Sequence, residues 1–294
     1  MQPNERLILA IQKKGRLSDD SLNLLKRCGL TLLSSKSSLF YSAENFPMDV
    51  LLVRDDDIPV LVRDQVCDLG IVGENVLSEH ETAFKKNTLE RIKNLGFGRC
   101  RLTLAIPKEV SYSDFSYFEG KRIATSYPNL LGSYLTKNQI QAEIIEISGS
   151  VEITPRLGMA EAICDLVSTG RTLGENNLKE VVTVLESQAV LVKTQNLSAS
   201  KNEILTVLLR RIEGVLQAQE SKYILFHAPK AAMETIQKLL PGSEIPTVLT
   251  LIGSEEKVAV HVVSRETVFW GTLEKLREAG ASSILVMPVE KMMM

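Results

Sequence analysis

The segment Ile163-Cys164-Asp165-Leu166-Val167-Ser168-Thr169-Gly170-Arg171-Thr172-Leu173 joins a short apolar run to a turn that is rich in hydroxyl groups. The apolar run predicts a buried strand, and the glycine in the turn can adopt a positive φ without steric cost. Hydroxyls and backbone N–H groups that converge around such a glycine form a cradle for an anion such as a phosphate. The same pattern is also typical of a plain strand-to-helix turn with a threonine N-cap, so the segment alone leaves both interpretations open.

The composition of the chain limits its class. Its 294 residues are 44% hydrophobic and 24% charged, which predicts a globular protein of two domains or three small ones. The net charge of −2 gives no global reason to bind nucleic acid or an anionic membrane, so an anionic ligand is expected to be small and locally held. No apolar run approaches the ~20 residues of a membrane span, and the N-terminus lacks a signal-peptide pattern, which together predict a cytoplasmic protein.

Cysteine and histidine usage limits the possible metal sites. The four cysteines are widely spaced and form no C-x-x-C pair, which predicts reduced core thiols rather than disulfides or a zinc site. The three histidines are too scattered to predict a histidine-based metal site. A metal ion in this protein is therefore expected to be Mg²⁺, held by carboxylates and a substrate phosphate.

The N-terminal region predicts an α/β unit with a polar turn at its first strand end. Residues 7–11 have the apolar pattern of a buried strand, and a basic turn follows at residues 13–16. A helix comes next, which Ser18 is expected to cap and Gly29 to end. Ligands bind at the carboxyl edge of open α/β sheets, where this turn lies, although most charged turns are simply solvated surface.

A second strand is predicted at residues 48–53, ending in an arginine and three successive acids. Asp56 and Asp57 are interpreted as residues that cap a helix at 59–66, because acids are favourable in the first turn of a helix. Arg54 and Asp55 lie closest to the strand end and are the better candidates for a functional role.

Two segments of the chain resemble each other. Residues 66–73 contain Val-Cys-Asp-Leu followed by a glycine, and residues 163–170 contain Ile-Cys-Asp-Leu followed by a glycine. A proline precedes each segment, and a strand, a polar turn and a helix precede each proline. Such short similarity can arise by chance, but two α/β lobes of like design are the economical explanation. Two lobes that present strand-end turns to each other would enclose a cleft suited to a small ligand.

The rest of the chain predicts a return to the first lobe and then a separate module. Residues 96–101 are interpreted as a crossing between the lobes, and a linking helix is expected at about 198–219. Residues 223–289 show βαββαβ order, with a Pro241-Gly242 turn and a second helix at 267–279, which predicts a ferredoxin-like α+β domain. This domain carries few candidate catalytic groups, which favours a role in ligand sensing or assembly.

Nearly the whole chain resembles the long form of the ATP phosphoribosyltransferase family, which performs the first step of histidine biosynthesis. The most specific match is Glu152-x5-Gly158-x-Ala160-x2-Ile163-x-Asp165-Leu166-x2-Thr169-Gly170-Arg171-Thr172-Leu173. Supporting matches lie at residues 12–18, 53–59, 68–73, 123–128 and 281–286.

The resemblance implies an α/β fold with two lobes like those of periplasmic binding proteins, an inter-lobe cleft and a C-terminal ferredoxin-like (ACT-like) α+β domain. The implied domains are residues 1–105 with a return segment at about 187–220, residues 106–186 with the phosphate loop, and residues 221–294 as the regulatory domain. The implied reaction joins the phosphoribosyl group of phosphoribosyl pyrophosphate (PRPP) to the adenine N1 of ATP and releases pyrophosphate. Mg²⁺ as cofactor, feedback inhibition by histidine and a dimer-based hexamer are implied as well.

Roles for individual residues follow from this chemistry. Charge accumulates on pyrophosphate as it leaves, so Lys14, Arg16 and Arg54 are candidate catalytic cations. Glu152 and Asp165 could accept the ribose hydroxyls or help to hold Mg²⁺, while a structural role for Asp165 stays open. The expected substrate-binding residues are Asp55, Asp68, Gly73, Ser126, Tyr127, Glu152, Asp165, Ser168, Thr169, Gly170, Arg171 and Thr172.

Two other classes share parts of the pattern. Solute receptors and sensor domains also have two α/β lobes, but a signal segment or a DNA-binding module would be expected beside them. An enzyme of the hydroxymethylbilane synthase type would need a cofactor-bearing cysteine in its last domain, and all four cysteines precede that domain. Neither class explains the segment at residues 152–173.

Overall fold

The computed structural model describes residues 5–34, 39–84, 89–219, 221–240, 245–265 and 270–292. The chain divides into two compact units, Met1–Leu205 and Thr206–Met294, and each is described by itself. The division falls inside helix α6 (Ala199–Gln219), whereas the expected domain boundary followed this helix. The Pro241-Gly242 turn and the expected helix start at residue 267 lie outside the described residues.

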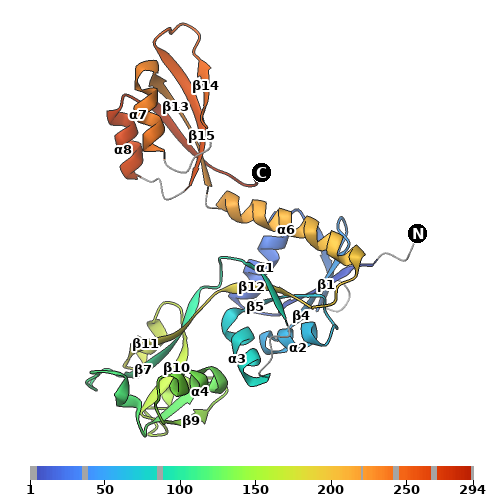
Figure 1. The fold of residues 1–294 in the computed structure, drawn as a ribbon, viewed down its shortest axis with the longest axis vertical. Coiled ribbons are helices and arrows are strands. Elements are labelled where there is room, and N and C mark those ends of the chain that lie inside the picture. The colour runs from blue at the N-terminus through green and yellow to red at the C-terminus, as the bar shows by residue number, and fades with distance from the viewer. Residues whose placement is uncertain are drawn as a thin grey trace. The chain divides into compact units, whose positions relative to one another are not determined.

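The first lobe of unit Met1–Leu205 is built on a mixed sheet, whose described strands run in the order β2-β3-β4-β1-β5-β12-β6. Strands β1, β4, β5 and β12 of this sheet are labelled in Figure 1. Its strands are β1 (Leu7–Gln12), β2 (Leu32–Ser34), β3 (Phe40–Ala43), β4 (Met48–Val53), β5 (Leu69–Gly73), β6 (Glu90–Asn94) and β12 (Ala189–Lys193). Its helices are α1 (Arg16–Arg27), η1 (Asp55–Asp57), α2 (Ile58–Arg63) and α3 (Glu74–Phe84). The apolar runs of β1, β5 and β12 are buried almost completely, because they are inner strands of the sheet and apolar residues of α2 and α3 pack against them.

Helix α1 begins earlier than its sequence suggests. Gly15 occupies the N-cap with a φ of 99°, and Ser18 is buried within the helix, so the expected cap at Ser18 is wrong. A glycine can turn the chain directly from a strand into a helix at such a φ, which removes the need for a later cap. The expected end is confirmed, since Gly29 has a φ of 83° and the N–H of Leu30 donates to the carbonyl of Leu25.

The second lobe has a sheet whose described strands run in the order β11-β7-β10-β8-β9. Its strands are β7 (Cys100–Pro107), β8 (Arg122–Thr125), β9 (Glu143–Glu146), β10 (Ala162–Val167) and β11 (Leu178–Ser187). Its helices are η2 (Phe115–Phe118), α4 (Pro128–Lys137), η3 (Val151–Ile153) and α5 (Arg171–Glu175). All of β7 lies in this sheet, so the lobe boundary expected between residues 105 and 106 falls inside a strand of the second lobe.

The two sheets repeat one topology. Strand β1 pairs in parallel with β4 and β5, as β8 pairs in parallel with β9 and β10. The next strand in each sheet is antiparallel: β12 lies beside β5 in the first lobe, and β7 lies beside β10 in the second. The edge strand beyond it is β6 in the first lobe and β11 in the second. Because β7 follows β6 along the chain and β12 follows β11, the chain crosses between the lobes twice. The internal repeat expected from the sequence is confirmed.

The strand register corrects the alignment of this repeat at Asp68. Asp68 precedes β5, where its carboxylate accepts a backbone N–H of β1 at 2.8 Å and pairs with Lys201 at 2.8 Å. In the second lobe the same contacts belong to Glu161, which accepts the backbone N–H of Arg122 at 2.8 Å and pairs with its guanidinium at 2.6 Å. Asp68 therefore corresponds to Glu161 and not to Asp165. It precedes the amino end of its strand, away from the polar turns, and its contacts favour a structural role over the substrate-binding role expected for it.

The unit Thr206–Met294 contains a ferredoxin-like βαββαβ fold. Its described strands run in the order β14-β15-β13-β16 with antiparallel pairing throughout, as the sequence predicted. They are β13 (Ser221–Pro229), β14 (Thr247–Thr250), β15 (Lys257–Arg265) and β16 (Ser282–Pro288), and the helices are η4 (Lys230–Ala232), α7 (Met233–Leu239) and α8 (Trp270–Glu278). Phe226 of β13, Ile236 of α7 and Leu276 of α8 are all buried in one core between the sheet and the helices.

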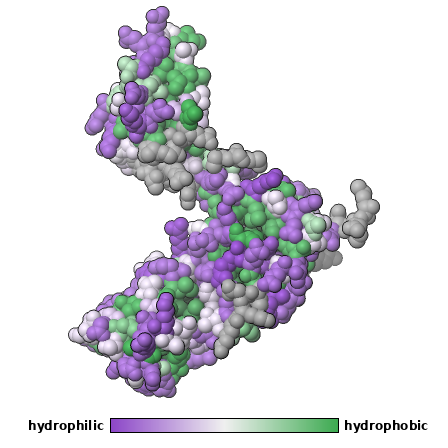
Figure 2. Space-filling model, viewed as in Figure 1, coloured by the Kyte–Doolittle hydropathy of each residue, from purple (hydrophilic) through white to green (hydrophobic). Residues whose placement is uncertain are grey.

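The opposite face of this sheet is apolar and exposed. Alternation along β13 directs Leu225 away from the core, and Leu285 lies directly beside it in the register. Leu249, Leu285 and Met287 are 50%, 55% and 42% exposed. Figure 2 shows apolar surface over this unit. In the part of the chain that the structure describes, no helix is long and apolar enough to cross a membrane.

Asp68→Asn tests the structural role of Asp68. The substitution keeps the shape of the side chain but leaves the Lys201 ammonium without its carboxylate, so we expect a loss of about 1–3 kcal/mol in unfolding free energy. The Michaelis constants for the two expected substrates should not change. Chemical denaturation and steady-state kinetics on the same preparation measure both quantities.

Glu161→Gln is the matched control, because its ion pair holds the same place in the second lobe with side chains that are 37–40% exposed. The Glu161→Gln substitution should lower the free energy of unfolding by less than about 1 kcal/mol. A large rise in a Michaelis constant for Asp68→Asn, with stability unchanged, would return Asp68 to the substrate site.

Candidate active site

A pocket of about 200 Å³ surrounds the loop that follows β10. It is lined by Glu152 of η3, Asp165 of β10 and the continuous residues 166–173. The structure thus brings together all the site residues expected from this segment, which are Glu152, Asp165, Ser168, Thr169, Gly170, Arg171 and Thr172.

The loop leaves its hydroxyl groups available to a ligand. Gly170 has a φ of 77° and occupies the N-cap of α5, where no side chain caps the helix, so the interpretation as a threonine N-cap is wrong. Among the described residues, the hydroxyls of Ser168, Thr169 and Thr172 form no hydrogen bond. Ser168 and Thr169 are exposed. Three unused donors around one left-handed glycine can bind an anion.

The two carboxylates of this pocket influence each other. Burial raises the pKa of Asp165, and the negative charge of Glu152 raises it further. The backbone N–H of Leu166 opposes this rise, because it donates a hydrogen bond of 2.8 Å to the Asp165 carboxylate. A cation placed between Glu152 and Asp165 would relieve this repulsion. No cluster of three or more His, Cys, Asp or Glu side chains able to hold a metal occurs in the described ranges. The pair therefore fits a Mg²⁺ ion whose remaining ligands are substrate oxygens and water.

Arg171 faces solvent. Its side chain is 84% exposed and pairs with Glu175 one helical turn later at 2.8 Å. Surface pairs of this kind contribute little to stability and rearrange easily. The residue lines the pocket, but the ion pair directs its guanidinium along α5.

A second pocket, of about 400 Å³, lies between the two lobes. Asp55 and Asp56 line it from the first lobe together with Val76, Glu79 and His80 of α3. The second lobe contributes Ser126, Tyr127, Glu146, Ile147, Ser148 and Gly149. The expected inter-lobe cleft is present. Asp57 occupies the N-cap of α2 and Asp56 lies in the first turn of η1, as expected for acids at a helix start, but neither makes a side-chain cap hydrogen bond, and Asp56 also lines this pocket.

Tyr127 lines the inter-lobe pocket and joins the two lobes. Its hydroxyl accepts a hydrogen bond from the Asn75 amide at 2.9 Å, across the gap between the lobes. Burial raises the pKa of the Tyr127 phenol, and the charges of Asp165 and Asp55 raise it further. Because Asp165 lines the loop pocket and Asp55 the inter-lobe pocket, both pockets lie within electrostatic reach of this one hydroxyl.

Gly73 and Ser126 position their neighbours. A Cβ at Gly73 would collide with the Oδ1 of Asn75, so only glycine allows Asn75 to reach Tyr127. The Ser126 hydroxyl donates to the carbonyl of Ile147 at 2.6 Å, which fixes the loop after β9 along the inter-lobe pocket.

A contact between α3 and α4 joins the lobes beside this pocket. The carboxylate of Glu79 accepts the backbone N–H groups of Asn129 and Leu130, both at 2.8 Å, and the Asn129 side chain at 2.7 Å. These N–H groups open helix α4, where a carboxylate is favourable. A residue of the first lobe thus supplies the cap for a helix of the second.

The three basic residues expected to be catalytic do not line the loop pocket or the inter-lobe pocket. Lys14, Arg16 and Arg54 are exposed, and none of them lines either pocket. Arg54 is the nearest along the chain, since it directly precedes Asp55, which lines the inter-lobe pocket.

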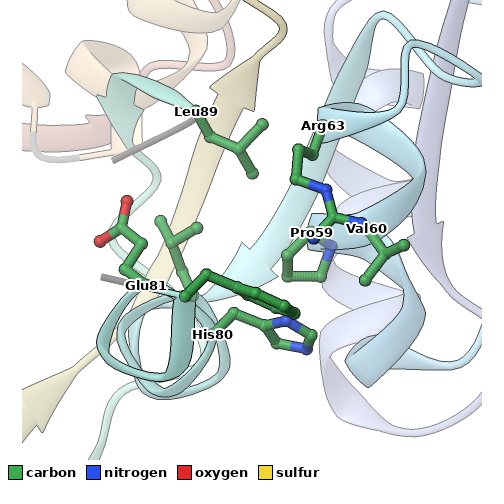
Figure 3. Close-up of a pocket in the computed structure, with 8 residues that line it drawn as sticks. Pro59, Val60, Arg63, His80, Glu81 and Leu89 are labelled. Carbon is green, nitrogen blue, oxygen red and sulfur yellow. The ribbon is translucent and has the colours of Figure 1, made fainter. Parts of the chain in front are cut away.

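Figure 3 shows a small pocket between α2 and α3 on the first lobe. Its cavity volume is about 10 Å³, which holds roughly one water molecule. The Arg63 guanidinium lies 4.9 Å from the centre of the Phe84 ring, and His80 stacks on the same ring at 5.9 Å. This packing fixes the part of α3 that carries Glu79 and His80 into the inter-lobe pocket.

Sequence reasoning missed several residues of the inter-lobe pocket. Glu79 and His80 lie within α3 and belong to no motif, and Asn75, at the start of the same helix, supports the pocket through its hydrogen bond to Tyr127. Their importance depends on how the lobes pack, which a single segment does not encode.

The HisG family, described as ATP phosphoribosyltransferase, matches residues 54–214, and the C-terminal domain of HisG matches residues 218–291. Among solved structures, the ATP phosphoribosyl transferase (HisG:HisZ) complex from Thermotoga maritima is 30% identical, and the match covers 72% of this chain and 98% of that chain with a TM-score of 0.62.

Solute-binding proteins match more loosely. The alkanesulfonate-binding protein SsuA from Xanthomonas axonopodis pv. citri is 14% identical, with 72% and 74% of the two chains covered and a TM-score of 0.45. Arginine-bound ArgBP from T. maritima is 10% identical, with 71% and 95% covered and a TM-score of 0.45. Scores this low do not carry a function from one protein to another.

The first family match spans more than half of the chain and includes both pockets, and the second covers the ferredoxin-like domain. The chain therefore belongs to the ATP phosphoribosyltransferase family, the pentosyltransferases of histidine biosynthesis, in its long form.

Proposed function

We propose that this protein joins the phosphoribosyl group of PRPP to the adenine N1 of ATP and releases pyrophosphate. The observation that carries the proposal is the loop pocket, where unused hydroxyls at residues 168–172 lie beside Glu152 and Asp165. Hydroxyl and amide donors suit the 5′-phosphate of PRPP, and two carboxylates suit the ribose hydroxyls or a Mg²⁺ ion.

The loop would anchor the sugar by its phosphate. Holding a substrate at two points, phosphate and ribose, converts a bimolecular encounter into an oriented one, which can supply several kcal/mol of the barrier. The anomeric carbon then projects from the loop pocket toward Tyr127 and the inter-lobe pocket. Mg²⁺, when bound, would neutralise part of the pyrophosphate charge.

The adenine of ATP would occupy the inter-lobe pocket. Its lining presents the acceptors Asp55 and Glu146, which suit the amino group of the base better than a triphosphate. The triphosphate and the departing pyrophosphate need cations, so Lys14, Arg16 and Arg54 at the exposed strand ends are proposed to meet them.

No general base is required for this reaction. The N1 nitrogen of adenine already has a lone pair, so the nucleophile needs position rather than deprotonation. The absence of a histidine beside the loop pocket, among its lining residues, is consistent with such chemistry.

The ferredoxin-like unit is proposed to bind histidine as a feedback inhibitor and to assemble dimers into a hexamer. Its own core supports independent folding, and its exposed apolar sheet face supports contact with another copy. The enzyme is expected to act in the cytoplasm.

A turnover assay tests the reaction. Incubation of the full chain with ATP, PRPP and Mg²⁺ should release pyrophosphate and form a product with altered adenine absorbance, and omission of any one component should abolish it. Histidine should lower the rate. Turnover without PRPP, or none with all three, would refute the proposed reaction, and turnover that histidine leaves unchanged would refute only the regulation.

Gly170→Val tests the loop as the phosphate site. A β-branched residue disfavours a φ of 77°, and its Cβ would lie 3.3 Å from an oxygen of Glu180, so the loop must change shape. We expect the dissociation constant for PRPP to rise at least about tenfold, measured by calorimetry. Gly120→Val is the matched control, since Gly120 has a φ of 65° in the same lobe and lies outside both pocket linings. Equal PRPP affinity in the two variants would overturn the assignment.

A further inference from the structure

An arginine–glutamate pair lies against the loop, outside the pocket lining. Arg101 of β7 grips Glu180 of β11 with two hydrogen bonds, Nε to Oε2 and Nη2 to Oε1, both of 2.6 Å. This is the bidentate fork geometry of strong charge-assisted pairs. The side chains are 32% and 28% exposed, so the pair lies at the edge of the solvent.

Both members of the pair touch the loop. Arg101 stands beside Val167, the last residue of β10, and its Nη1 lies 3.5 Å from the carbonyl oxygen of Ser168. Glu180 approaches the other side, where a Cβ on Gly170 would lie 3.3 Å from Oε1. The pair therefore contacts the loop at its entry and at its left-handed glycine.

The charges of the pair matter because the loop is the proposed phosphate site. A carboxylate this close to Gly170 would repel a bound phosphate if nothing compensated it. Arg101 compensates this charge through the fork, and its Nη1, 3.5 Å from the Ser168 carbonyl oxygen, ties the pair to the start of the loop.

We propose that Arg101 and Glu180 are positioning residues for the phosphate group of PRPP: the ion pair fixes the shape of the loop, and Arg101 shields the bound phosphate from Glu180. This inference rests on the proposed function. Neither residue touches the substrate, so their effect reaches the phosphate through the loop.

A second pair in the same sheet provides a control of equal chemistry. Arg122 grips Glu161 with Nη2 at 2.6 Å and also donates to the carbonyl of Gly158 at 3.1 Å. Its side chains are 40% and 37% exposed. It lies at the amino ends of β8 and β10, away from the loop. If such a pair only stabilised the fold of the lobe, loss of either pair would have the same effect on the kinetic constants.

The test compares Arg101→Gln, Glu180→Gln, the double variant and Arg122→Gln in steady-state kinetics. Arg101→Gln leaves the Glu180 carboxylate uncompensated, so the KM for PRPP should rise about tenfold, while the KM for ATP stays within about twofold. The double variant should recover part of this loss because the repelling carboxylate is gone. Arg122→Gln should leave both constants unchanged.

Three results would overturn the inference: an unchanged KM for PRPP in Arg101→Gln, a double variant no better than Arg101→Gln, or an equal effect from Arg122→Gln. Thermal melting confirms that each variant is folded. If Arg101→Gln does not fold, Arg101→Lys keeps the charge without the fork and should raise the KM for PRPP by a smaller factor, and no rise there counts against the proposal. Loss of PRPP binding in Gly170→Val with normal Arg101 variants would refute this inference alone, and an inactive wild type would refute the proposed function.

Discussion

The structure of the catalytic unit depends on one reciprocal contact where the chain crosses between its lobes. Ala189 accepts the N–H of Leu95 and donates its own N–H to the carbonyl of Phe97, both at 2.9 Å. Ala189 is fully buried, so water cannot replace these hydrogen bonds if they break. The contact is therefore strongly favoured. The outgoing and returning segments are therefore joined at the place where the lobes meet, and each lobe receives the antiparallel strand that completes its sheet.

A line of hydrogen bonds runs from this crossing to the proposed active site. Ser187, at the end of β11, accepts the N–H of Asn75 at 3.1 Å and donates to its side-chain oxygen at 2.8 Å. The amide of Asn75 then donates to Tyr127, which lines the inter-lobe pocket. Asn75 is buried, and its backbone N–H, its side-chain oxygen and its side-chain amide each have a partner from the crossing or from the other lobe. The crossing thus determines the orientation of the residue that binds Tyr127.

The sequence predicts the parts of this arrangement that are contiguous. The loop at residues 168–172, its strand and its two carboxylates form one motif, and the structure places them in one pocket. The repeat is visible for the same reason. The sequence aligns Asp68 with Asp165, and this alignment is wrong. An apolar run followed by a glycine occurs in both segments, but the pattern does not show at which residue each strand begins to pair with its neighbour. Only the contacts of Asp68 and Glu161 with the neighbouring strands show which residues correspond. The roles of Glu79, Arg101 and Glu180 could not be predicted from the sequence, because each residue contacts a segment that is distant along the chain.

The proposed reaction assigns different tasks to the two lobes. The phosphate loop and the Arg101–Glu180 pair belong entirely to the second lobe, so they can hold PRPP whatever the angle between the lobes. In the proposed reaction adenine would instead meet residues of both lobes, and its N1 would have to come within about 3–3.5 Å of the anomeric carbon for attack. Asn75 and Glu79 are the first-lobe residues that bind residues 127–130 of the second, so they fix this angle. Weakening these two contacts would disturb the approach of the nucleophile more than the affinity for the sugar phosphate.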